Sequence, residues 1–500
     1  MFVFNTEACV FILYFLFMIG IGLFFFLKTK SGGDKEYFLG GRQMGPWVSA
    51  LSAGASDMSA WVLMGLPASI FAFGMGKTWI AIGLAIGYAL SWIFLAPRLR
   101  RFSIKANDSI TIPQYLTNRF LSKNKALQII CAIIFLLAYT VYAASSIKAC
   151  GTLFNQVIGI DTTIAMYIAA LVIISYTFLG GFSAVCWTDF FQGLLMLAAL
   201  LIAPIVVLLM VQTGSLASKP LPEGFMSFTS NWKDILSGMG WGLGYFGMPH
   251  IIIRFMSIRS EKDLKKSRVI GITWTTIIIF MAAVAATAGK LFLGDLEDTS
   301  TVFIQMTRTV FPTIISGVLL SAILAASMST ADSQLLAASS AFASDVYKPV
   351  LRKGQATDKE MLWVGRLVVM VIAIFALLIA ANPNSGTIMG LVENAWGLFG
   401  AAFGATIMLS LFWKRFNLAG AIAGIVSGTI VDILWLILFN YSFGDDKVGL
   451  ITNTPFNGVY EIIPGALFSL LVAIAVTYAT NAPSKEVEDL FDSAVVSTEE

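Results

Sequence analysis

The feature of this sequence that most restricts its fold is a succession of continuous apolar runs, most of them about 20 residues long. That is the length an α-helix needs to cross a bilayer. Continuous runs exclude an outer-membrane barrel, whose strands alternate apolar and polar residues. With 57% hydrophobic and 12% charged residues, the 500-residue chain cannot cover a soluble surface with charge. The sequence therefore predicts an all-α polytopic membrane protein.

We expect about thirteen transmembrane helices. The first run is interpreted as a retained span rather than a signal peptide, because no basic segment precedes it. The expected spans are 6–27, 47–72, 78–97, 126–147, 161–180, 190–212, 234–253, 269–291, 309–337, 362–381, 386–412, 418–440 and 459–480.

Lysine and arginine are unevenly distributed over the loops that thirteen spans create. Of the 32 basic residues, 25 fall in alternate segments that begin with 28–46, and seven fall in the others. Basic residues favour the cytoplasmic side of a membrane. We therefore expect a multi-pass plasma-membrane protein with its N-terminus outside, its C-terminus in the cytoplasm, and an acidic cytoplasmic tail at 483–500.

Cysteine and histidine usage argues against an enzyme. The four cysteines lack metal-binding or disulfide spacing, and His250 is the only histidine. No convincing serine-nucleophile, phosphate-loop or dinucleotide motif is present. We predict no enzymatic activity, no nucleic-acid partner and no obligate protein partner.

Two expected spans contain clusters of small and polar residues at membrane depth, at Ser52–Ser59 and at Ala325–Ser333. Such residues weaken a helix, and unwound backbone inside a membrane survives only where it lines a cavity or binds a ligand. Paired interruptions indicate the central site of a transporter. We expect both spans to be broken and to meet.

The second cluster offers oxygen ligands at helical spacing. Ala326, Ser329 and Thr330 lie at i, i+3 and i+4, which places one carbonyl and two hydroxyls on one face. The carbonyls of Ala55 and Met58, freed if the first cluster unwinds, would complete five neutral oxygens, a set that suits a monovalent cation. Alternatively, the hydroxyls bond back to their own helix or allow close helix packing.

Acidic residues accompany these clusters. Asp57 lies in mid-membrane, where a carboxylate costs about 2.5–3.5 kcal/mol on insertion scales, so a functional role beside the ion is expected. The alternative is a protonated or helix-capping Asp57. Asp189 is interpreted either as a functional group or as a helix N-cap, and Asp332 is placed near a cytoplasmic exit.

An aromatic stripe marks the span 234–253. Trp241, Tyr245 and Pro249 recur at i, i+4 and i+8, and the glycines around them would leave space beside the rings. Tyr142 is a candidate second wall. Aromatic faces beside a void suit an aliphatic ring or an amine, although ordinary helix packing also produces such stripes.

The ordered motifs of the chain resemble those of the solute:sodium symporter family, over about residues 5–480. The stretches that carry the resemblance are YFLGGR (37–42), SAGASDMSAW (52–61), LMGLP (63–67), YTFLGGF (176–182), WTD (187–189), WGLGYFGMPHI (241–251) and MST (328–330).

The resemblance implies a leucine-transporter-like fold of two inverted repeats of five helices with extra helices. The repeats would be 47–212 (spans 2–6) and 233–412 (spans 7–11). The first span and its loop occupy 1–46, and spans 12–13 occupy 413–482.

The resemblance also implies sodium-coupled import of L-proline, with another small amino acid or organic solute as the alternative. It implies a co-transported sodium ion bound by Ala55, Met58, Ala326, Ser329 and Thr330, with Asp57 needed for sodium affinity. The implied substrate-binding residues are Ser59, Ala60, Tyr142, Trp241, Tyr245 and Pro249.

Overall fold

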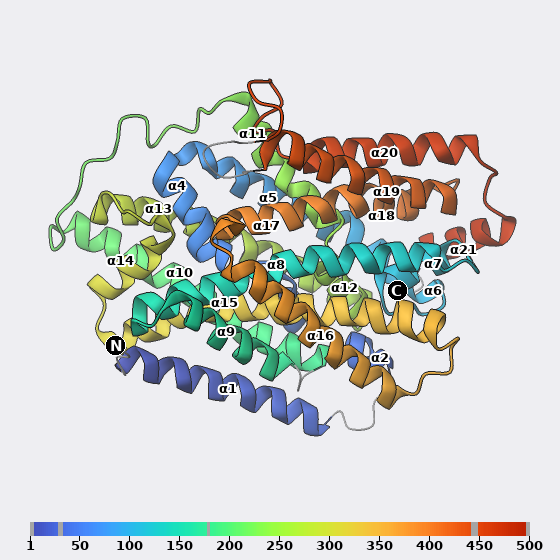
Figure 1. The fold of residues 1–500 in the computed structure, drawn as a ribbon, viewed down its shortest axis with the longest axis horizontal. Coiled ribbons are helices and arrows are strands. Elements are labelled where there is room, and N and C mark those ends of the chain that lie inside the picture. Colours follow the sequence, from blue (N-terminus) through green and yellow to red (C-terminus); the bar gives the residue numbers. More distant parts are fainter. Residues whose placement is uncertain (1–4, 29–33, 178–180, 442–448, 497–500) are drawn as a thin grey trace.

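The computed structural model describes residues 5–28, 34–177, 181–441 and 449–496. Within those ranges the chain is helical, and its β-type pairing is limited to one bridge between Met44 and Ile258. Most long helices run roughly along one direction, as a bundle (Figure 1). The α-helices are α1 Thr6–Lys28, α2 Asp34–Leu39, α3 Pro46–Ala55, α4 Leu66–Phe73, α5 Trp79–Leu90, α6 Ala96–Lys105, α7 Ile112–Arg119, α8 Ala126–Ile158, α9 Thr162–Thr177, α10 Phe182–Gln212, α11 Trp232–Gly240, α12 Pro249–Ser257, α13 Glu261–Leu293, α14 Val302–Val310, α15 Thr313–Ser340, α16 Asp358–Ala381, α17 Ile388–Phe399, α18 Ala405–Phe412, α19 Leu418–Trp435, α20 Ile462–Ala479 and α21 Lys485–Val495.

Ten of the described helical segments are long and apolar enough to cross a membrane. The remaining expected spans fall on the apolar helix within Thr162–Ser175 and on two interrupted segments, 46–73 and 232–257. The all-α polytopic prediction is confirmed. The count of thirteen stays a prediction.

Several helices are longer than the apolar runs that predicted them. Both α8 and α13 have 33 residues, because helical backbone continues into polar sequence at the bundle ends. Their limits follow local chemistry: the Ser260 hydroxyl accepts a hydrogen bond from the Asp263 amide at the start of α13, and Gly159 ends α8 in the left-handed conformation.

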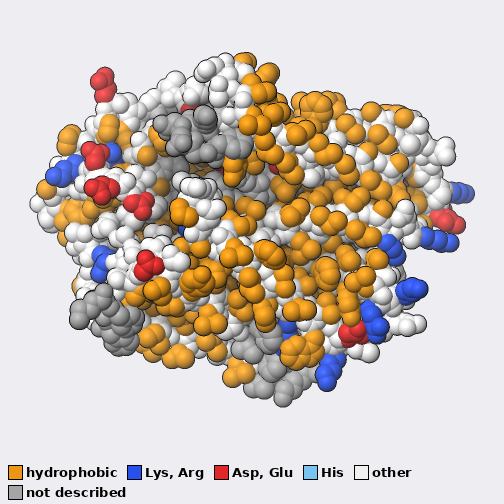
Figure 2. All heavy atoms as spheres, in the orientation of Figure 1, with side chains coloured by type: hydrophobic (Ala, Val, Ile, Leu, Met, Phe, Trp, Pro, Cys, Tyr) orange, Lys and Arg blue, Asp and Glu red, His pale blue; other side chains and the backbone are white. Residues whose placement is uncertain are grey.

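The outer surface of the bundle is apolar between two charged ends. Figure 2 shows hydrophobic side chains across the middle of the visible face, with Lys, Arg, Asp and Glu gathered at its two ends. Leu171 and Phe280 are 68% and 65% exposed. A band of exposed apolar side chains of this kind is the surface that lipid covers.

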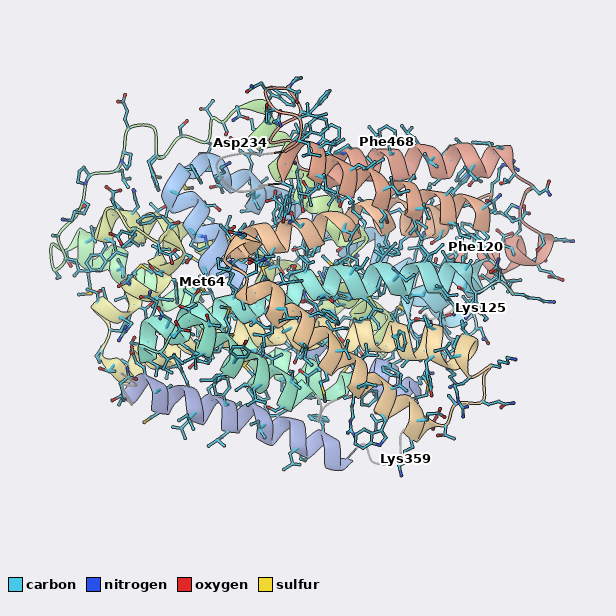
Figure 3. The ribbon with its side chains drawn as sticks, in the orientation of Figure 1. Met64, Phe120, Lys125, Asp234, Lys359 and Phe468 are labelled. Atoms are coloured by element: carbon cyan, nitrogen blue, oxygen red, sulfur yellow. The ribbon has the colours of Figure 1, made fainter. Side chains whose placement is uncertain are left out.

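The two ends of the bundle differ in composition. One, here named the basic end, contains Arg42, Arg100, Arg119 and Lys414, and Lys125 and Lys359 are seen near it in Figure 3. The opposite end contains the Lys77–Asp234 ion pair, with N···O at 2.8 Å. At the basic end, α21 lies against α6 with Phe491 and Phe102 in edge contact at 5.3 Å, so the described part of the acidic tail is a docked helix. Tail residues 497–500, and residues 178–180 of the YTFLGGF motif, lie outside the described ranges.

The centre of the bundle is built around α15. This helix packs against α10, α8 and α1, and α10 packs in turn against α3 and α13. Helices α19 and α20 form a pair with each other. The arrangement brings the polar face of α15 to the end of α3, where the first interruption begins.

Candidate functional site

The first interruption lies where the sequence predicts it. Helix α3 ends at Ala55, residues 56–59 are not helical, and helical backbone resumes at Ala60 and continues through a π-helical turn to α4. The amides of Asp57 and Met58 both donate to the Gly54 carbonyl, at 3.2 and 2.9 Å. Residues 56–59 are buried, so this opened backbone lies inside the protein.

The expected interruption at 325–333 is wrong. Helix α15 is continuous from Thr313 to Ser340 and is buried along most of its length. The Ser327 hydroxyl donates to the Ile323 carbonyl of its own helix at 2.8 Å. Small residues here allow neighbouring helices to approach closely, and this packing maintains the helix despite the weak propensity of the cluster.

The second broken span is instead 232–257. It consists of α11, a 3-10 segment at Trp241–Phe246, a break at Gly247–Met248, and α12, which begins at Pro249. Met248 is extended, as the residue before a proline prefers. The sequence contains the glycine-rich run and the proline, but its aromatic spacing at i, i+4 and i+8 predicts one continuous helix over this span.

The predicted ion ligands from α3 and α15 lie together. The Ser329 hydroxyl oxygen is 2.8 Å from the Ala55 carbonyl oxygen and 3.1 Å from the Ala326 carbonyl oxygen. The Thr330 hydroxyl is buried and has no hydrogen-bond partner among the described residues. Met58 is fully buried in the adjoining open turn. These neutral oxygens, one of them without a partner, fit a bare monovalent cation.

Asp57 joins the two broken spans. Its carboxylate oxygen Oδ2 accepts a hydrogen bond from the Tyr245 hydroxyl at 2.5 Å, while Oδ1 is buried without a partner within the described part of the chain. The Asp57 carbonyl accepts from Trp61 Nε1 at 3.0 Å and from the Tyr142 hydroxyl at 3.4 Å. Asp57 therefore connects the opened backbone beside the ion ligands to two predicted substrate residues.

The aromatic candidates belong to a larger cluster that includes two residues the sequence analysis missed. Trp396 of α17 lies 5.0 Å from Tyr245 and 6.2 Å from Trp241 between ring centroids, and its Nε1 donates to the Trp241 carbonyl at 2.8 Å. The Tyr460 ring is 5.2 Å from that of Trp241. Trp396 and Tyr460 come from distant spans and carry no local spacing signal, so only the fold brings them here.

The expected void beside the stripe is wrong, because neighbouring atoms occupy the glycine faces. A Cβ added at Gly244 would overlap the Trp396 ring, and one added at Gly242 would overlap the Gly83 carbonyl of α5. These glycines allow close approach of helices rather than leaving space. Pro249 is buried beyond the break, so the three residues do not form one continuous α-helical stripe.

The remaining candidates line the open turn of the first broken span. Ser59 and Ala60 are each 1% exposed, and the Ser59 hydroxyl oxygen is 3.4 Å from the Trp61 amide that it accepts from. Nearby, a His250 ring nitrogen lies 3.1 Å from the Ser56 carbonyl oxygen. The two broken spans thus meet side by side at membrane depth.

A buried arginine, counted in the sequence analysis only as a loop charge, ties four helices together. Arg254 of α12 donates to Asp189 Oδ2 at 3.0 Å, to the Ser52 hydroxyl at 3.0 Å and to the Ser333 hydroxyl at 2.5 Å. Ser52 itself donates to Asp189 at 2.6 Å. Asp189 is therefore an ion-pair partner, and its interpretation as an N-cap is wrong. Asp332, beside Ser333, accepts a hydrogen bond from the Ser333 hydroxyl at 3.3 Å.

A second arginine, Arg42, connects several segments at the basic end through hydrogen bonds. The Arg42 guanidinium donates to Asp108 at 2.9 Å, to the Ser109 carbonyl at 2.8 Å and to the Met256 carbonyl at 2.5 Å. Partial burial raises the pKa of Asp108, but hydrogen bonds from Lys35 and Arg42 outweigh it and hold that pKa below its ordinary value of 3.8. Arg42 thus links the loop before α3 to the end of the second broken span.

Two solved structures share this fold. A Na⁺-coupled sialic acid symporter, in a substrate-bound outward-open state, superposes with a TM-score of 0.76 at 20% identity, covering 96% of this chain and 99% of that one. Mhp1, a nucleobase-cation-symport-1 family transporter in a closed conformation, gives a TM-score of 0.56 at 15% identity, with 93% and 99% coverage. These likenesses identify the leucine-transporter-like fold of sodium-coupled symporters.

Sequence comparisons define the family more narrowly. The chain is 43% identical over 486 residues to the high-affinity proline transporter PutP of Bacillus subtilis (strain 168), covering 95% of this chain and 98% of that one. It is 42% identical to the sodium/proline symporter of Staphylococcus aureus (strain USA300 / TCH1516), with 95% and 93% coverage. The model of the sodium:solute symporter family matches residues 37–428. The chain therefore belongs to the sodium:solute symporter family.

Proposed function

We propose that this protein imports L-proline across the plasma membrane together with sodium. The observation that carries the proposal is the contact of Ser329 with the Ala55 carbonyl, beside the buried Thr330 hydroxyl, which has no hydrogen-bond partner in the described ranges. The two relatives named above, both described as proline transporters, support proline as the solute.

In this proposal sodium is held between α15 and the open turn after α3. Its ligands are the carbonyls of Ala55, Met58 and Ala326 and the hydroxyls of Ser329 and Thr330. The ion replaces the hydrogen bond between Ser329 and Ala55, while Asp57 supplies negative potential across the break. Sodium then stabilises the arrangement in which the two elements lie together.

Proline binds beside the ion in the same proposal. Its carboxylate meets backbone amides near Ser59 and Ala60, where helical backbone resumes and the helix dipole favours an anion. Its ring lies against Trp241 and Tyr245, with Tyr142 and Pro249 completing the walls. Because Tyr245 also donates to Asp57, proline and sodium act on one connected set of contacts. By linkage, proline tightens sodium binding by the same factor that sodium tightens proline binding.

Transport proceeds by alternating access between the two ends of the bundle. We assign the basic end to the cytoplasm and the N-terminus to the outside, following the loop charges. The repeats 47–212 and 233–412 each contain one broken span, which agrees with an inverted-repeat transporter. The sodium gradient and the membrane potential, about 2.3 kcal/mol per charge per 100 mV, drive accumulation.

Radiolabelled proline uptake into proteoliposomes tests this function. We expect accumulation with an inward sodium gradient and only equilibration when potassium replaces sodium. Excess unlabelled amino acids, added singly, identify the solute: proline competes, and other small amino acids compete weakly. Uptake that is independent of sodium, or that another amino acid blocks better than proline, would refute the proposal.

A further inference from the structure

A cavity of about 500 Å³ opens at the opposite end of the bundle, next to the aromatic cluster. Its walls come from the connection at 383–386, from α17, and from the segments that flank α19 and α20. Glu393, Asn394, Asn440, Tyr460 and Glu461 are among the residues that line it. None of the ion or substrate contacts described above involves its carboxyl groups.

Glu461 in the cavity wall and Asp432, which approaches the same glycine of α17, are buried and incompletely paired. Glu461 is 2% exposed; its Oε2 accepts a hydrogen bond from the Asn440 side chain at 3.0 Å, whereas Oε1 has no partner among the described residues. Asp432 is 1% exposed, and its Oδ1 likewise lacks a partner in the described ranges. Buried carboxylate oxygens of this kind are costly unless a cation or proton compensates them.

Both acids lie close to one glycine of α17, Gly397. A Cβ built on Gly397 would lie 3.2 Å from Asp432 Oδ1, 3.2 Å from the Tyr460 ring and 3.4 Å from Glu461 Cγ. The acids therefore flank one point in the bundle, with an aromatic ring beside them. Two carboxyl groups beside an aromatic face form a setting for a cation.

Three described lysines at this end of the bundle are engaged in other contacts. Lys77 pairs with Asp234 at 2.8 Å, and Lys233 donates to the Asn457 carbonyl at 2.9 Å. Lys148 bonds to Ser385 and Gly386 at the cavity rim, with Nζ 3.2 Å from the Ser385 hydroxyl. Within the described residues, none of these three lysines forms an ion pair with Glu461 or Asp432, so none of them neutralises the two acids.

We propose that this cavity binds a compact monovalent cation, held by Glu461 and Asp432 beside the Tyr460 ring. The described residues contain no group of three His, Cys, Asp or Glu side chains arranged to hold a metal ion, which argues against a divalent ion held by several carboxylates. The cation is a sodium ion or the ammonium group of an amino acid. The ammonium source rests on the proposed function, whereas the sodium source needs only the family assignment.

Tyr460 connects this cavity to the central aromatic cluster. Its ring is 5.2 Å from that of Trp241, and its hydroxyl donates to the Glu393 carbonyl at 2.8 Å. A cation bound above Tyr460 therefore changes the surroundings of Trp241 and of its neighbour Trp396. Tryptophan fluorescence is thus a direct readout of occupancy.

The test uses the purified full-length protein and two probes without proline, ²²Na⁺ and pyrrolidinium chloride. Glu461→Gln and Asp432→Asn remove the charge while keeping the shape. Glu223→Gln, in the exposed 213–231 loop, is the matched control for loss of one acid. Ser329→Ala weakens the central ion site and isolates the cavity. Melting curves for each variant show whether it is folded.

If sodium is the ligand, ²²Na⁺ binding that persists in Ser329→Ala weakens about tenfold or more when Glu461→Gln or Asp432→Asn is added. If the ligand is an ammonium group, ²²Na⁺ binding is unchanged, but the fluorescence response to pyrrolidinium is lost in the same variants. Glu223→Gln alters neither. Unchanged responses to both probes in either folded acid variant overturn the inference. Wild-type protein that binds the cation but fails to import proline refutes the proposed function alone.

Discussion

At the scale of single residues, Ser329 has two possible partners for one hydroxyl. Its oxygen reaches the carbonyls of both Ala55 and Ala326; the Ala326 carbonyl lies inside the continuous helix α15, whereas the Ala55 carbonyl lies at the end of α3. A cation contacts all three oxygens at once. This convergence of oxygens is what the proposed ion site requires.

Replacing Ser329 by Ala should raise the sodium concentration for half-maximal proline uptake about tenfold, equivalent to about 1.4 kcal/mol. The variant loses one ion ligand. Ser327→Ala is the control, because that hydroxyl donates to the Ile323 carbonyl of its own helix and is not one of the proposed ion ligands. Sodium titration of uptake in proteoliposomes measures both. A wild-type sodium requirement in Ser329→Ala would count against the ligand assignment.

Asp57→Asn should also raise the sodium requirement, because it removes the negative charge beside the ion while keeping an oxygen for Tyr245. Tyr245→Phe keeps the charge of Asp57 but removes the hydroxyl that joins the proposed proline site to it. This variant should therefore impair proline binding more than sodium binding. Separate titrations of sodium and proline distinguish the two variants. If both changed the sodium requirement alone, Tyr245 would be removed from the substrate site.

Local pattern predicted some of these residues and not others. Ser329, Thr330 and Ala326 share one helical face, and Asp57 is conspicuous as a mid-membrane acid, so sequence alone was sufficient to single them out. Trp396, Tyr460 and Arg254 have roles only through contacts between distant spans. Their positions depend on packing, which residue spacing does not encode.

At the scale of elements, close contacts at glycine position the second broken span. A Cβ added at Gly87 of α5 would overlap the Gly242 backbone, so these two segments approach only because both lack side chains. The sequence showed the glycines but not their partners. It also showed the weak helix propensity of 325–333 without the packing that keeps α15 intact.

Gly87→Ala should therefore abolish uptake or prevent accumulation of folded protein, because the added methyl forces α5 and the Trp241–Phe246 segment apart. Gly20→Ala, on the first span, meets nothing within 4 Å and is the control. Fluorescence-detected size-exclusion profiles, together with uptake, separate loss of folding from loss of function. Normal uptake by Gly87→Ala would show that the contact is not required.

The ion pair between Arg254 and Asp189 also holds helices together, through charge rather than close packing. Arg254→Gln leaves Asp189 buried without its cation and should lower the free energy of unfolding by about 3–5 kcal/mol. The double variant Arg254→Gln/Asp189→Asn removes both charges and should regain most of that loss. Thermal unfolding in detergent compares the set. A double variant no more stable than Arg254→Gln would show that the ion pair contributes little.

At the scale of the whole molecule, the proposed sodium site joins helices α3 and α15, which are far apart in the chain. Replacing potassium with sodium at constant ionic strength should raise the melting temperature. A ligand present at about 100 times its Kd adds about 2.7 kcal/mol to the free energy of unfolding. Ser329→Ala should reduce this shift, and proline should enlarge it in the wild-type protein. An equal melting temperature in both salts would contradict a specific sodium site.

The unbroken α15 has a consequence for how the ion departs. A continuous helix buried along its length is expected to move as one unit, whereas residues 56–59 form a non-helical turn held by short-range bonds such as those from the Asp57 and Met58 amides to the Gly54 carbonyl. The two sides of the proposed ion site thus differ: α15 is a continuous helix, whereas residues 56–59 form a turn that can change its conformation more easily. If the proposed site releases sodium by movement of this turn, labels placed on α4 should report release and labels on α15 should stay still.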